Sequence, residues 1–451
     1  MNTSFFGELL QTISDRGRAL LVRDRRGEAS RSETLVELCE DLLSGRGEAS
    51  GVALAREILG RYAELTTGPR IAFFEALAER FGTDQARLEQ AVAAWREKPS
   101  DATAADVHVA SEPRRQELFR RLNLAPAGTA ALVRMREQLM DALDHREDLA
   151  AVDNDFVHLF SSWFNRGFLV LRHIDWSTPA IVLEKIIRYE AVHEINGWED
   201  LRRRIDPADR RCYAFFHPAL VDEPLIFVEV ALSRDMPDAI APILATGRET
   251  VEPDKMRTAA FYSISNCQRG LAGVSFGNFL IKQVVEEVRR EMPKLSTFVT
   301  LSPVTNFASW LQRERASDSS QALTDADKAT MTILDQPGWH LDAAAAEEVK
   351  DPVMRAAAWY FVRARSARGM PLDPVARFHL GNGARLERIN WLADTSDKAM
   401  EKALGLMVNY RYELDDIEKN HEAFAEKRTV VASSAVQRLL RPALELVPVA
   451  G

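Results

Sequence analysis

The sequence predicts an α+β protein of two domains, an all-helical bundle over residues 1–156 followed by a mixed α/β domain over residues 157–451. Two observations lead to this prediction. The chain has 451 residues, more than a single hydrophobic core ordinarily accommodates. The spacing of its apolar residues also changes near Trp163, from a helical period before that residue to short strands alternating with helices after it.

Composition and charge narrow the classes of function. Hydrophobic residues make up 46% of the chain and charged residues 28%, which is typical of a folded, soluble protein. The formal net charge of −9 argues against binding to phosphate backbones, so we expect no nucleic-acid partner. No run of about 18 apolar residues indicates a membrane span. The first residues also lack the pattern of a secretory signal, and we expect a cytoplasmic protein.

The three cysteines, Cys39, Cys212 and Cys267, lie far apart in the sequence and form no C-x-x-C pair. This spacing indicates neither a zinc site nor a disulfide framework. A sparse, odd count of cysteines is typical of a reducing compartment. We therefore expect no structural metal.

The front of the chain repeats amphipathic helical segments. Segment 51–65 places Leu54, Ile58 and Tyr62 at helical spacing, and the next segment begins near Pro69. We predict Thr83 as the N-cap of the helix that follows. Further segments with a helical period are 30–43, 113–124 and 129–145. Almost nothing here is typical of a strand, so a helical bundle is the simplest interpretation.

The rear of the chain alternates strands with helices. Predicted strands are 167–174, two strands within 212–232, then 258–266 and 296–303. We predict a helix over 177–193, with Ser177 as its N-cap, and a strongly amphipathic helix over 276–292. The strand, helix and strand between residues 258 and 303 form a βαβ unit, which implies locally parallel strands.

A glycine-rich loop connects the strand and helix of this unit. Gly270, Gly273 and Gly277 fall within eight residues. Glycines allow the backbone to turn tightly and to approach a ligand, and the helix N-terminus offers unpaired N–H groups. The combination is suited to a pyrophosphate, although a connection without a ligand is the alternative. The loop matches neither the P-loop nor the dinucleotide fingerprint, which indicates another phosphate ligand, such as coenzyme A.

The same loop contains a G-x-S-x-G pattern over residues 273–277, with Ser275 at its centre. In the nucleophile elbow of serine hydrolases, a strand runs directly into the first glycine. Here the residues QRGLAG intervene, which is typical of a loop. A serine hydrolase is therefore kept only as an alternative.

Six sequence blocks, in order along the rear domain, resemble the malonyl-CoA decarboxylase family. They are YAFFHP (213–218), EPLIFVEVAL (223–232), FYSISNCQRGLAGVSFGNFLIKQVV (261–285), TFVTLSPVTNFASWL (297–311), ARFHLGNGARLERINWLAD (376–394) and GLMVNYRYE (405–413). The resemblance implies that the rear domain is similar to the GNAT acetyltransferases, with a mixed sheet splayed open for a pantetheine arm. It implies decarboxylation of malonyl-CoA to acetyl-CoA and CO2 without metal, biotin or another cofactor. It further implies a homotetramer built as a dimer of dimers, with the helical domain as its oligomerisation domain.

The resemblance also assigns candidate site residues. Ser302 in TLSPV and His379 in RFHLGNGA match the family's catalytic serine and histidine. Tyr412 in NYRYE matches a tyrosine near the site and is taken as substrate-binding. The family's coenzyme A loop matches the residues Ala272, Gly273, Val274, Ser275, Phe276, Gly277 and Asn278. The loop departs from the acetyltransferase pyrophosphate motif, which has Arg or Gln where Cys267 stands.

This chemistry suits a serine and a histidine. Loss of CO2 from a malonyl thioester leaves an enolate, which requires donors for its oxygen and a proton for C2. A histidine with a pKa near neutral can hold and give that proton, and a serine hydroxyl can accept one hydrogen bond while donating another. Our hypothesis is that Ser302 orients the malonyl group while His379 stabilises and protonates the enolate. Taken alone, Ser302 before Pro303 is typical of a turn and His379 of a structural histidine, so the resemblance decides between the interpretations.

Two other functions stay open on the sequence. One is a coenzyme A-dependent acyltransferase of GNAT fold, and the other is a non-catalytic acyl-CoA-binding oligomerisation protein. Fold similarity alone does not separate them from a decarboxylase. The LSPV and FHLGNG segments, which ordinary GNAT enzymes lack, favour the decarboxylase. A transferase also needs an acyl acceptor, and a binding protein predicts affinity without turnover.

Overall fold

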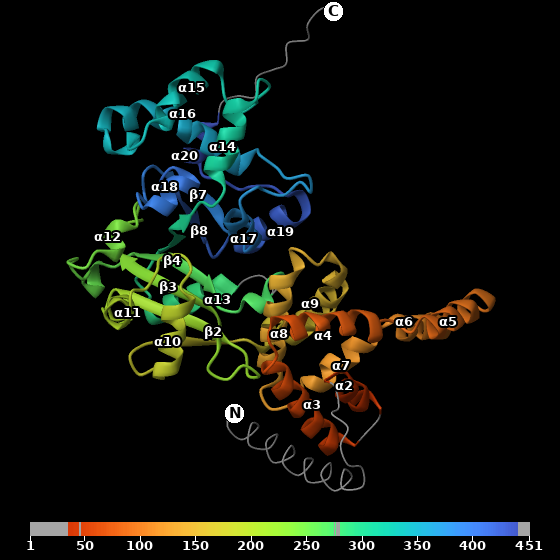
Figure 1. Ribbon diagram of the computed structural model, residues 1–451. Helices are drawn as coiled ribbons and strands as arrows, with labels where there is room; N and C mark the ends of the chain where they lie inside the picture. Colours follow the sequence, from red (N-terminus) through yellow and green to blue (C-terminus); the bar gives the residue numbers. More distant parts are fainter. Residues whose placement is uncertain (1–34, 45–46, 275, 277–279, 441–451) are drawn as a thin grey trace, which may run out of the picture. The chain divides into compact units, whose positions relative to one another are not determined.

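The computed structural model describes residues 35–44, 47–274, 276 and 280–440 (Figure 1). The chain divides into two compact units, and each is discontinuous in the sequence. The helical unit comprises Met1–Val170, Phe216–Leu225 and Gln268–Phe276. The sheet unit comprises Leu171–Phe215, Ile226–Cys267 and Gly277–Gly451. The described part of the glycine-rich loop therefore belongs to the helical unit, although strand β4 and helix α13 on either side of it belong to the sheet unit.

The first unit is helical, as the sequence predicted. Its α-helices are α2 (Leu35–Leu43), α3 (Glu48–Ala63), α4 (Thr67–Arg80), α5 (Gln85–Glu97), α6 (Asp101–Ser111), α7 (Arg114–Leu122), α8 (Gly128–Leu143) and α9 (Ala150–Trp163), and its short 3-10 helices are η2 (Glu147–Leu149), η3 (Arg166–Phe168) and η5 (Arg269–Leu271). Figure 1 shows α5 and α6 side by side, extending away from the other helices of the unit, and no residue of α5 is buried.

Aromatic side chains fill the core of the helical unit. The rings of Phe119 on α7 and Phe156 on α9 stack with their centroids 4.1 Å apart, and both residues are fully buried. A buried carboxylate lies next to them, because Asp155 of α9 pairs with Arg115 and accepts a hydrogen bond of 2.5 Å from Gln116. The apolar pattern therefore predicted a bundle correctly, but it did not locate α6 or α9.

Two predicted helix caps are wrong. Helix α5 is capped by Asp84, whose carboxylate accepts a backbone N–H of the first turn, whereas the Thr83 hydroxyl donates to the carbonyl of Ser111. The N-cap of the helix predicted from Ser177 is Pro179, and the Ser177 hydroxyl is bound within the preceding turn. In both cases a neighbouring acceptor takes the hydroxyl that the pattern assigned to the helix.

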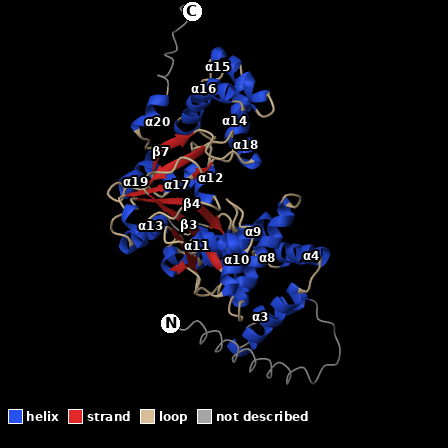
Figure 2. Cartoon of the chain, turned by 90° about the vertical axis from the view of Figure 1, so that its left-hand side faces the viewer, coloured by secondary structure: helices blue, strands red, loops and turns tan. Residues whose placement is uncertain are grey.

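The sheet unit contains one mixed sheet, shown as red arrows in Figure 2. Its strands are β1 (Val170–Ile174), β2 (Arg210–Phe216), β3 (Pro224–Ser233), β4 (Thr258–Asn266), β5 (Thr297–Thr300), β6 (Ser302–Pro303), β7 (Arg385–Asn390) and β8 (Met407–Arg411). The order is β1-β2-β3-β4-β5-β8-β6, and β7 also pairs with β8. Strands β4 and β5 are parallel, which confirms the predicted βαβ unit.

Helices surround this sheet in the chain order. They are α10 (Ala180–Tyr189), α11 (Trp198–Ile205), α12 (Ala241–Leu244), η4 (Pro253–Lys255), α13 (Leu280–Glu291), α14 (Phe307–Ala316), α15 (Asp325–Thr330), η6 (Met331–Asp335), η7 (Trp339–Leu341), α16 (Ala343–Val362), α17 (Pro374–Gly381), α18 (Asp397–Ala403), α19 (Ile417–Lys427) and α20 (Ser434–Leu439). The mixed α/β character of the rear of the chain is as predicted. The segment from α14 to α16 was not predicted.

Strands β4 and β5 separate after a short shared stretch. Their paired residues run from Thr258↔Thr297 to Phe261↔Thr300, whereas β4 continues to Asn266. The pairing of β4 with β3 shifts register between Glu229 and Val230, which is a β-bulge. The last five residues of β4 therefore have no partner in β5, and the sheet is open at this place.

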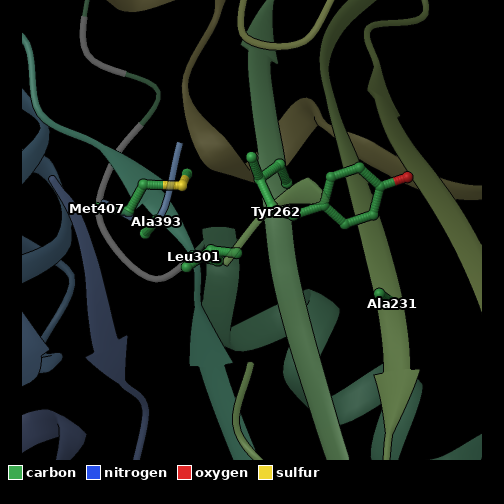
Figure 3. Packing of buried hydrophobic residues seen from close by; sticks show 6 residues of the cluster. Ala231, Tyr262, Leu301, Ala393 and Met407 are labelled. Atoms are coloured by element: carbon green, nitrogen blue, oxygen red, sulfur yellow. The ribbon is translucent and has the colours of Figure 1, made fainter. Parts of the chain in front are cut away.

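A buried core stands beside this opening. Tyr262, Leu301 and Met407 pack together with Ala231, Ile240 and Ala393, and Figure 3 shows five of these side chains meeting between the strands. Leu301 links β5 to β6. Because successive side chains of extended chain point to opposite sides, Thr300 and Ser302 face away from this core. Among the described residues, no helix is long and apolar enough to cross a membrane.

Candidate active site

The structure brings Ser302 and His379 together, although 77 positions separate them in the sequence. Ser302 opens β6, and His379 lies in the last turn of α17. The serine Oγ and the histidine Nε2 are 3.2 Å apart, within hydrogen-bond distance. Their residues are only 5% and 2% exposed, so the pair is largely shielded from bulk water.

Tyr412 and Thr300 extend this pair at its two ends. The Tyr412 hydroxyl lies 2.8 Å from Nδ1 of His379, and the Ser302 hydroxyl donates a hydrogen bond of 2.8 Å to Oγ1 of Thr300. The ring of Tyr410 stacks on the imidazole, with the two ring centroids 4.7 Å apart. The imidazole is therefore held through both nitrogens and through one face. The predicted residues Ser302, His379 and Tyr412 are all in one cluster.

The hydrogen-bond partners indicate which nitrogen of His379 carries the proton. In the described part of the chain, His379 Nδ1 is the one partner of the Tyr412 hydroxyl, so this O–H has an acceptor only when it donates to Nδ1. The imidazole proton then lies on Nε2 and is donated to Ser302 Oγ. Ser302 in turn donates to Thr300, whose hydroxyl donates to the carbonyl of Val408 at 3.5 Å. All the hydrogen bonds thus run in one direction, from Tyr412 towards Thr300.

Burial sets the charge state of this cluster. It lowers the pKa of His379 to about 3, because the charged imidazolium loses its hydration there. The sequence hypothesis assumed an ordinary histidine with a pKa near neutral, and the structure corrects that assumption. Burial also raises the pKa of the Tyr412 and Tyr410 phenols well above the usual value. All three rings are neutral at physiological pH.

Asp373 connects the two elements that carry the pair. It is the N-cap of α17, where its carboxylate accepts the Ala376 N–H at 2.8 Å. The same carboxylate accepts the N–H and the hydroxyl of Thr305, both at 3.2 Å, from the loop that follows β6. Burial raises the pKa of Asp373, while these donors oppose the shift. One buried side chain therefore joins the segment after Ser302 to the helix of His379.

Asn409 fixes the strands beneath the cluster. Its side-chain amide donates to the carbonyl of Thr300 at 2.7 Å and to that of Pro237 at 3.2 Å. Its carbonyl oxygen accepts from Asn390 at 2.9 Å and from Arg388 at 3.0 Å. Asn409 has no exposed surface, so this network is satisfied within the protein. It ties β8 to both β5 and β7 at the level of Thr300.

The predicted coenzyme A loop is described in part. Ser275, Gly277 and Asn278 lie outside the described residues, whereas Ala272, Gly273, Val274 and Phe276 lie within them. Two of the loop's N–H groups are used within the loop itself, because Ala272 donates to the Arg269 carbonyl at 2.9 Å and Val274 to the Leu271 carbonyl at 3.0 Å. Gly273 is exposed and has a φ of 78°, a conformation that favours glycine.

Sequence reasoning missed the residues that support the cluster. Asp373 followed by Pro374 is a typical helix start, so this signal was present in the sequence. Thr300, Asn409 and Tyr410 carry no such signal, because their role depends on contacts between distant strands. Within the described residues, no cluster of His, Cys, Asp or Glu side chains could hold a metal ion.

Comparison with known families gives two matches. A model described as malonyl-CoA decarboxylase C-terminal domain matches residues 167–449, and one described as malonyl-CoA decarboxylase N-terminal domain matches residues 81–164. A curated protein of Anser anser anser, named malonyl-CoA decarboxylase, mitochondrial, is 36% identical over 417 residues. That alignment covers 84% of this chain and 82% of the goose-family protein's own length.

Solved structures give the same result. The crystal structure of malonyl-CoA decarboxylase from Rhodopseudomonas palustris is 57% identical, with a TM-score of 0.87, and the match covers 90% of this chain and 98% of that one. The structure of malonyl-CoA decarboxylase from Agrobacterium vitis is also 57% identical, with a TM-score of 0.86, covering 90% of this chain and 100% of that one. Sequence and fold therefore point to one family across nearly the whole chain.

Proposed function

The chain belongs to the malonyl-CoA decarboxylase family, and on this premise we propose that it converts malonyl-CoA to acetyl-CoA and CO2 with Ser302 and His379 as the catalytic pair. The observation that carries the proposal is the buried, one-directional chain of hydrogen bonds from Tyr412 through His379 and Ser302 to Thr300. Such a chain presents a neutral N–H donor beside a hydroxyl in a site of low polarity. Donors of this kind stabilise an enolate oxygen or deliver its proton.

Ser302 orients the malonyl group in this proposal. Its hydroxyl accepts from His379 and donates to Thr300, so it can exchange one of these partners for the substrate with little movement. Because the imidazole is uncharged, it does not form an ion pair with the leaving carboxylate. Strong binding of that carboxylate would stabilise the ground state, which slows its loss.

His379 gives the proton, and Tyr412 replaces it. The C–C bond to the carboxylate breaks, CO2 leaves, and the electron pair forms the enolate. C2 of the enolate takes the Nε2 proton while Nδ1 takes the Tyr412 O–H proton, so the imidazole stays neutral and changes tautomer. The phenolate formed is a much weaker base than the enolate, and solvent protonates it after the product leaves. The balance is one solvent proton consumed per CO2 released.

The path of the coenzyme A thioester belongs to the same proposal. The opening between β4 and β5 beyond Phe261 leaves strand backbone free to bind an extended pantetheine arm, which supports the GNAT-like relationship. The loop over residues 272–278 would hold the pyrophosphate. Gly273 supports this assignment because its backbone is exposed and a ligand can approach it closely.

Several predictions from the sequence remain part of the proposal. They are the domain boundary after residue 156, an oligomerisation role for the helical domain, a homotetramer arranged as a dimer of dimers, and a cytoplasmic location. The reaction needs neither metal nor biotin in this account, because the thioester itself accepts the electron pair. The Anser anser anser relative is named mitochondrial, and that name applies to that protein.

The test is a purified-protein assay with malonyl-CoA and with no acyl acceptor, metal or biotin. CO2 and acetyl-CoA are measured together, and we expect equal amounts of both, with the Ser302→Ala protein slower by about 10²–10⁴-fold. Release of free coenzyme A would instead indicate hydrolysis. Binding of malonyl-CoA without any product would contradict the decarboxylase and favour a transferase or a binding protein.

A further inference from the structure

Arg136 of α8 binds the backbone of the glycine-rich loop. One terminal nitrogen of its guanidinium donates to the carbonyl of Gly270 at 2.9 Å and to that of Ala272 at 2.7 Å. The other side of the guanidinium pairs with Asp153 of α9, with Nε and Oδ1 2.8 Å apart. Arg136 is only 3% exposed. A buried cation with a paired carboxylate and two carbonyl acceptors is a fixed structural element, unlike a solvated surface arginine.

The loop also packs directly against α8 at Gly270. A Cβ built at this glycine would collide with the carbonyl oxygen and carbon of Val133, so only glycine permits this approach. Arg269 forms an ion pair of 2.5 Å with Asp141 farther along the same helix, although both side chains are exposed and the pair contributes little. Three neighbouring loop residues, 269, 270 and 272, thus contact one helix.

The position of these carbonyls determines where the next N–H points. In a trans peptide the C=O of one residue and the N–H of the following residue point in opposite directions. Arg136 holds the Ala272 carbonyl towards α8, so the Gly273 N–H points away from that helix. Among the described residues no oxygen accepts this N–H, and nothing lies within 4 Å of a Cβ built at Gly273. An exposed, unpaired donor on a left-handed glycine is typical of an anion-binding backbone.

We propose that Arg136 is a positioning residue for substrate binding: by holding the Gly270 and Ala272 carbonyls, it orients the Gly273 N–H towards the phosphates of the coenzyme A thioester. The inference rests on the proposed function for the identity of the substrate. It gives the helical unit a role in substrate binding in addition to the predicted role in oligomerisation. Arg136 acts through the loop and does not touch the reacting atoms.

The experiment compares two substrates that differ in their phosphates. Malonyl-CoA carries them and malonyl-pantetheine does not, whereas the reacting thioester is the same. We expect Arg136→Gln to raise KM for malonyl-CoA about tenfold with kcat within about twofold of wild type, the size of one lost charged hydrogen-bond arrangement. The kinetic constants for malonyl-pantetheine should not change. Arg134→Gln, an exposed arginine on the same helix, is the matched control and should behave as wild type with both substrates.

Two further variants protect the test against misfolding. Arg136→Gln combined with Asp153→Asn removes both charges, so no carboxylate is left unpaired, and it should show the same selective rise in KM. Arg136→Lys keeps a cation with several donors and should restore part of the affinity. An unchanged KM for malonyl-CoA in folded Arg136→Gln protein contradicts the proposal, and so does an equal loss with malonyl-pantetheine, which would indicate general disturbance.

Binding of coenzyme A itself separates this inference from the proposed function. It is measured by calorimetry on the wild-type and Arg136→Gln proteins. Wild type that binds coenzyme A but does not decarboxylate malonyl-CoA would contradict the function, while a weaker affinity in the variant would still support the inference. Wild type that decarboxylates while both proteins bind equally would contradict the inference alone.

Discussion

At the scale of single residues, the chemistry depends on a histidine that burial keeps uncharged. An exposed histidine exchanges its proton with solvent near neutral pH, but His379 has a pKa lowered to about 3. Its two nitrogens consequently act as one donor and one acceptor at every pH at which the protein is folded. The Tyr412 hydroxyl then decides which nitrogen donates.

Replacement of Tyr412 by Phe tests this tautomer. Without the phenol O–H, Nδ1 loses its donor and the imidazole proton is free to occupy either nitrogen. We expect kcat for malonyl-CoA to fall by roughly 10²-fold, the lower range for an acid–base group. Tyr410→Phe is the control, because it keeps the ring that stacks on His379 and should keep nearly full activity. Equal activity of the two variants would show that the tyrosine hydroxyl has no role.

The lowered pKa of His379 also predicts a pH dependence of stability. Below about pH 6.5 the unfolded chain binds a proton at this histidine, whereas the folded protein does not bind it until about pH 3. The unfolded state therefore binds more protons, and stability falls as the pH falls. Relative to His379→Gln, wild type should lose up to about 1.4 kcal/mol of unfolding free energy per pH unit between pH 6 and 4. Urea unfolding at several pH values measures this difference, and a constant difference would contradict the assignment of charge.

At the scale of elements, α17 positions the histidine and its N-terminus fixes the helix. Asp373 caps this helix and at the same time binds Thr305 after β6. The distance between Ser302 and His379 therefore depends on one carboxylate that neither residue contacts. The Asn409 network serves the same purpose from the strands, because it holds the Thr300 backbone.

Asp373→Ala should separate a capping effect from a positioning effect. Loss of the cap costs about 1 kcal/mol of unfolding free energy, and loss of the link to Thr305 lets α17 shift, so we expect kcat to fall at least about tenfold. Asp84→Ala removes the cap of α5, whose helix has no buried residues, and is the matched control. It should lower stability by a similar amount and leave kcat unchanged. A normal kcat in Asp373→Ala would show that α17 is held by its packing alone.

Elements were predictable from the sequence wherever their pattern was local. The strand at residues 258–266 was located to the residue, and the parallel βαβ unit followed from its alternation with helix α13. Helix starts such as Thr83 and Ser177 were misplaced because the choice between neighbouring polar residues depends on tertiary acceptors. The contacts of Thr300 and Asn409 were not predictable, because they form between strands that are distant in the sequence.

At the scale of the whole molecule, the division into two units does not follow the order of the chain. The loop from Gln268 to Phe276 leaves the sheet unit and joins the helical unit, where Arg136 binds it. Sequence blocks identified this loop as a candidate for coenzyme A binding. They gave no indication of Arg136, because a single arginine on an amphipathic helix has no distinctive pattern. The predicted site was therefore correct in its catalytic cluster and incomplete in what supports its loop.

The predicted homotetramer belongs to this scale. Light scattering on the purified full chain should give four times the mass of one chain. Dilution of a dimer of dimers should produce dimers before single chains, because its two kinds of interface differ in area. A mass of one chain at all concentrations would contradict the prediction, and the catalytic proposal would be unaffected.

The most direct test of the central claim is kcat of the His379→Ala protein with malonyl-CoA, measured as CO2 released beside acetyl-CoA formed. The variant should fold, because the position is an apolar pocket that tolerates a smaller side chain, and its KM should stay near that of wild type. We predict a kcat lower by about 10²–10⁴-fold, the scale of a lost proton donor. A kcat close to that of wild type would contradict the assignment of His379, and with it the buried chain of hydrogen bonds as the catalytic device.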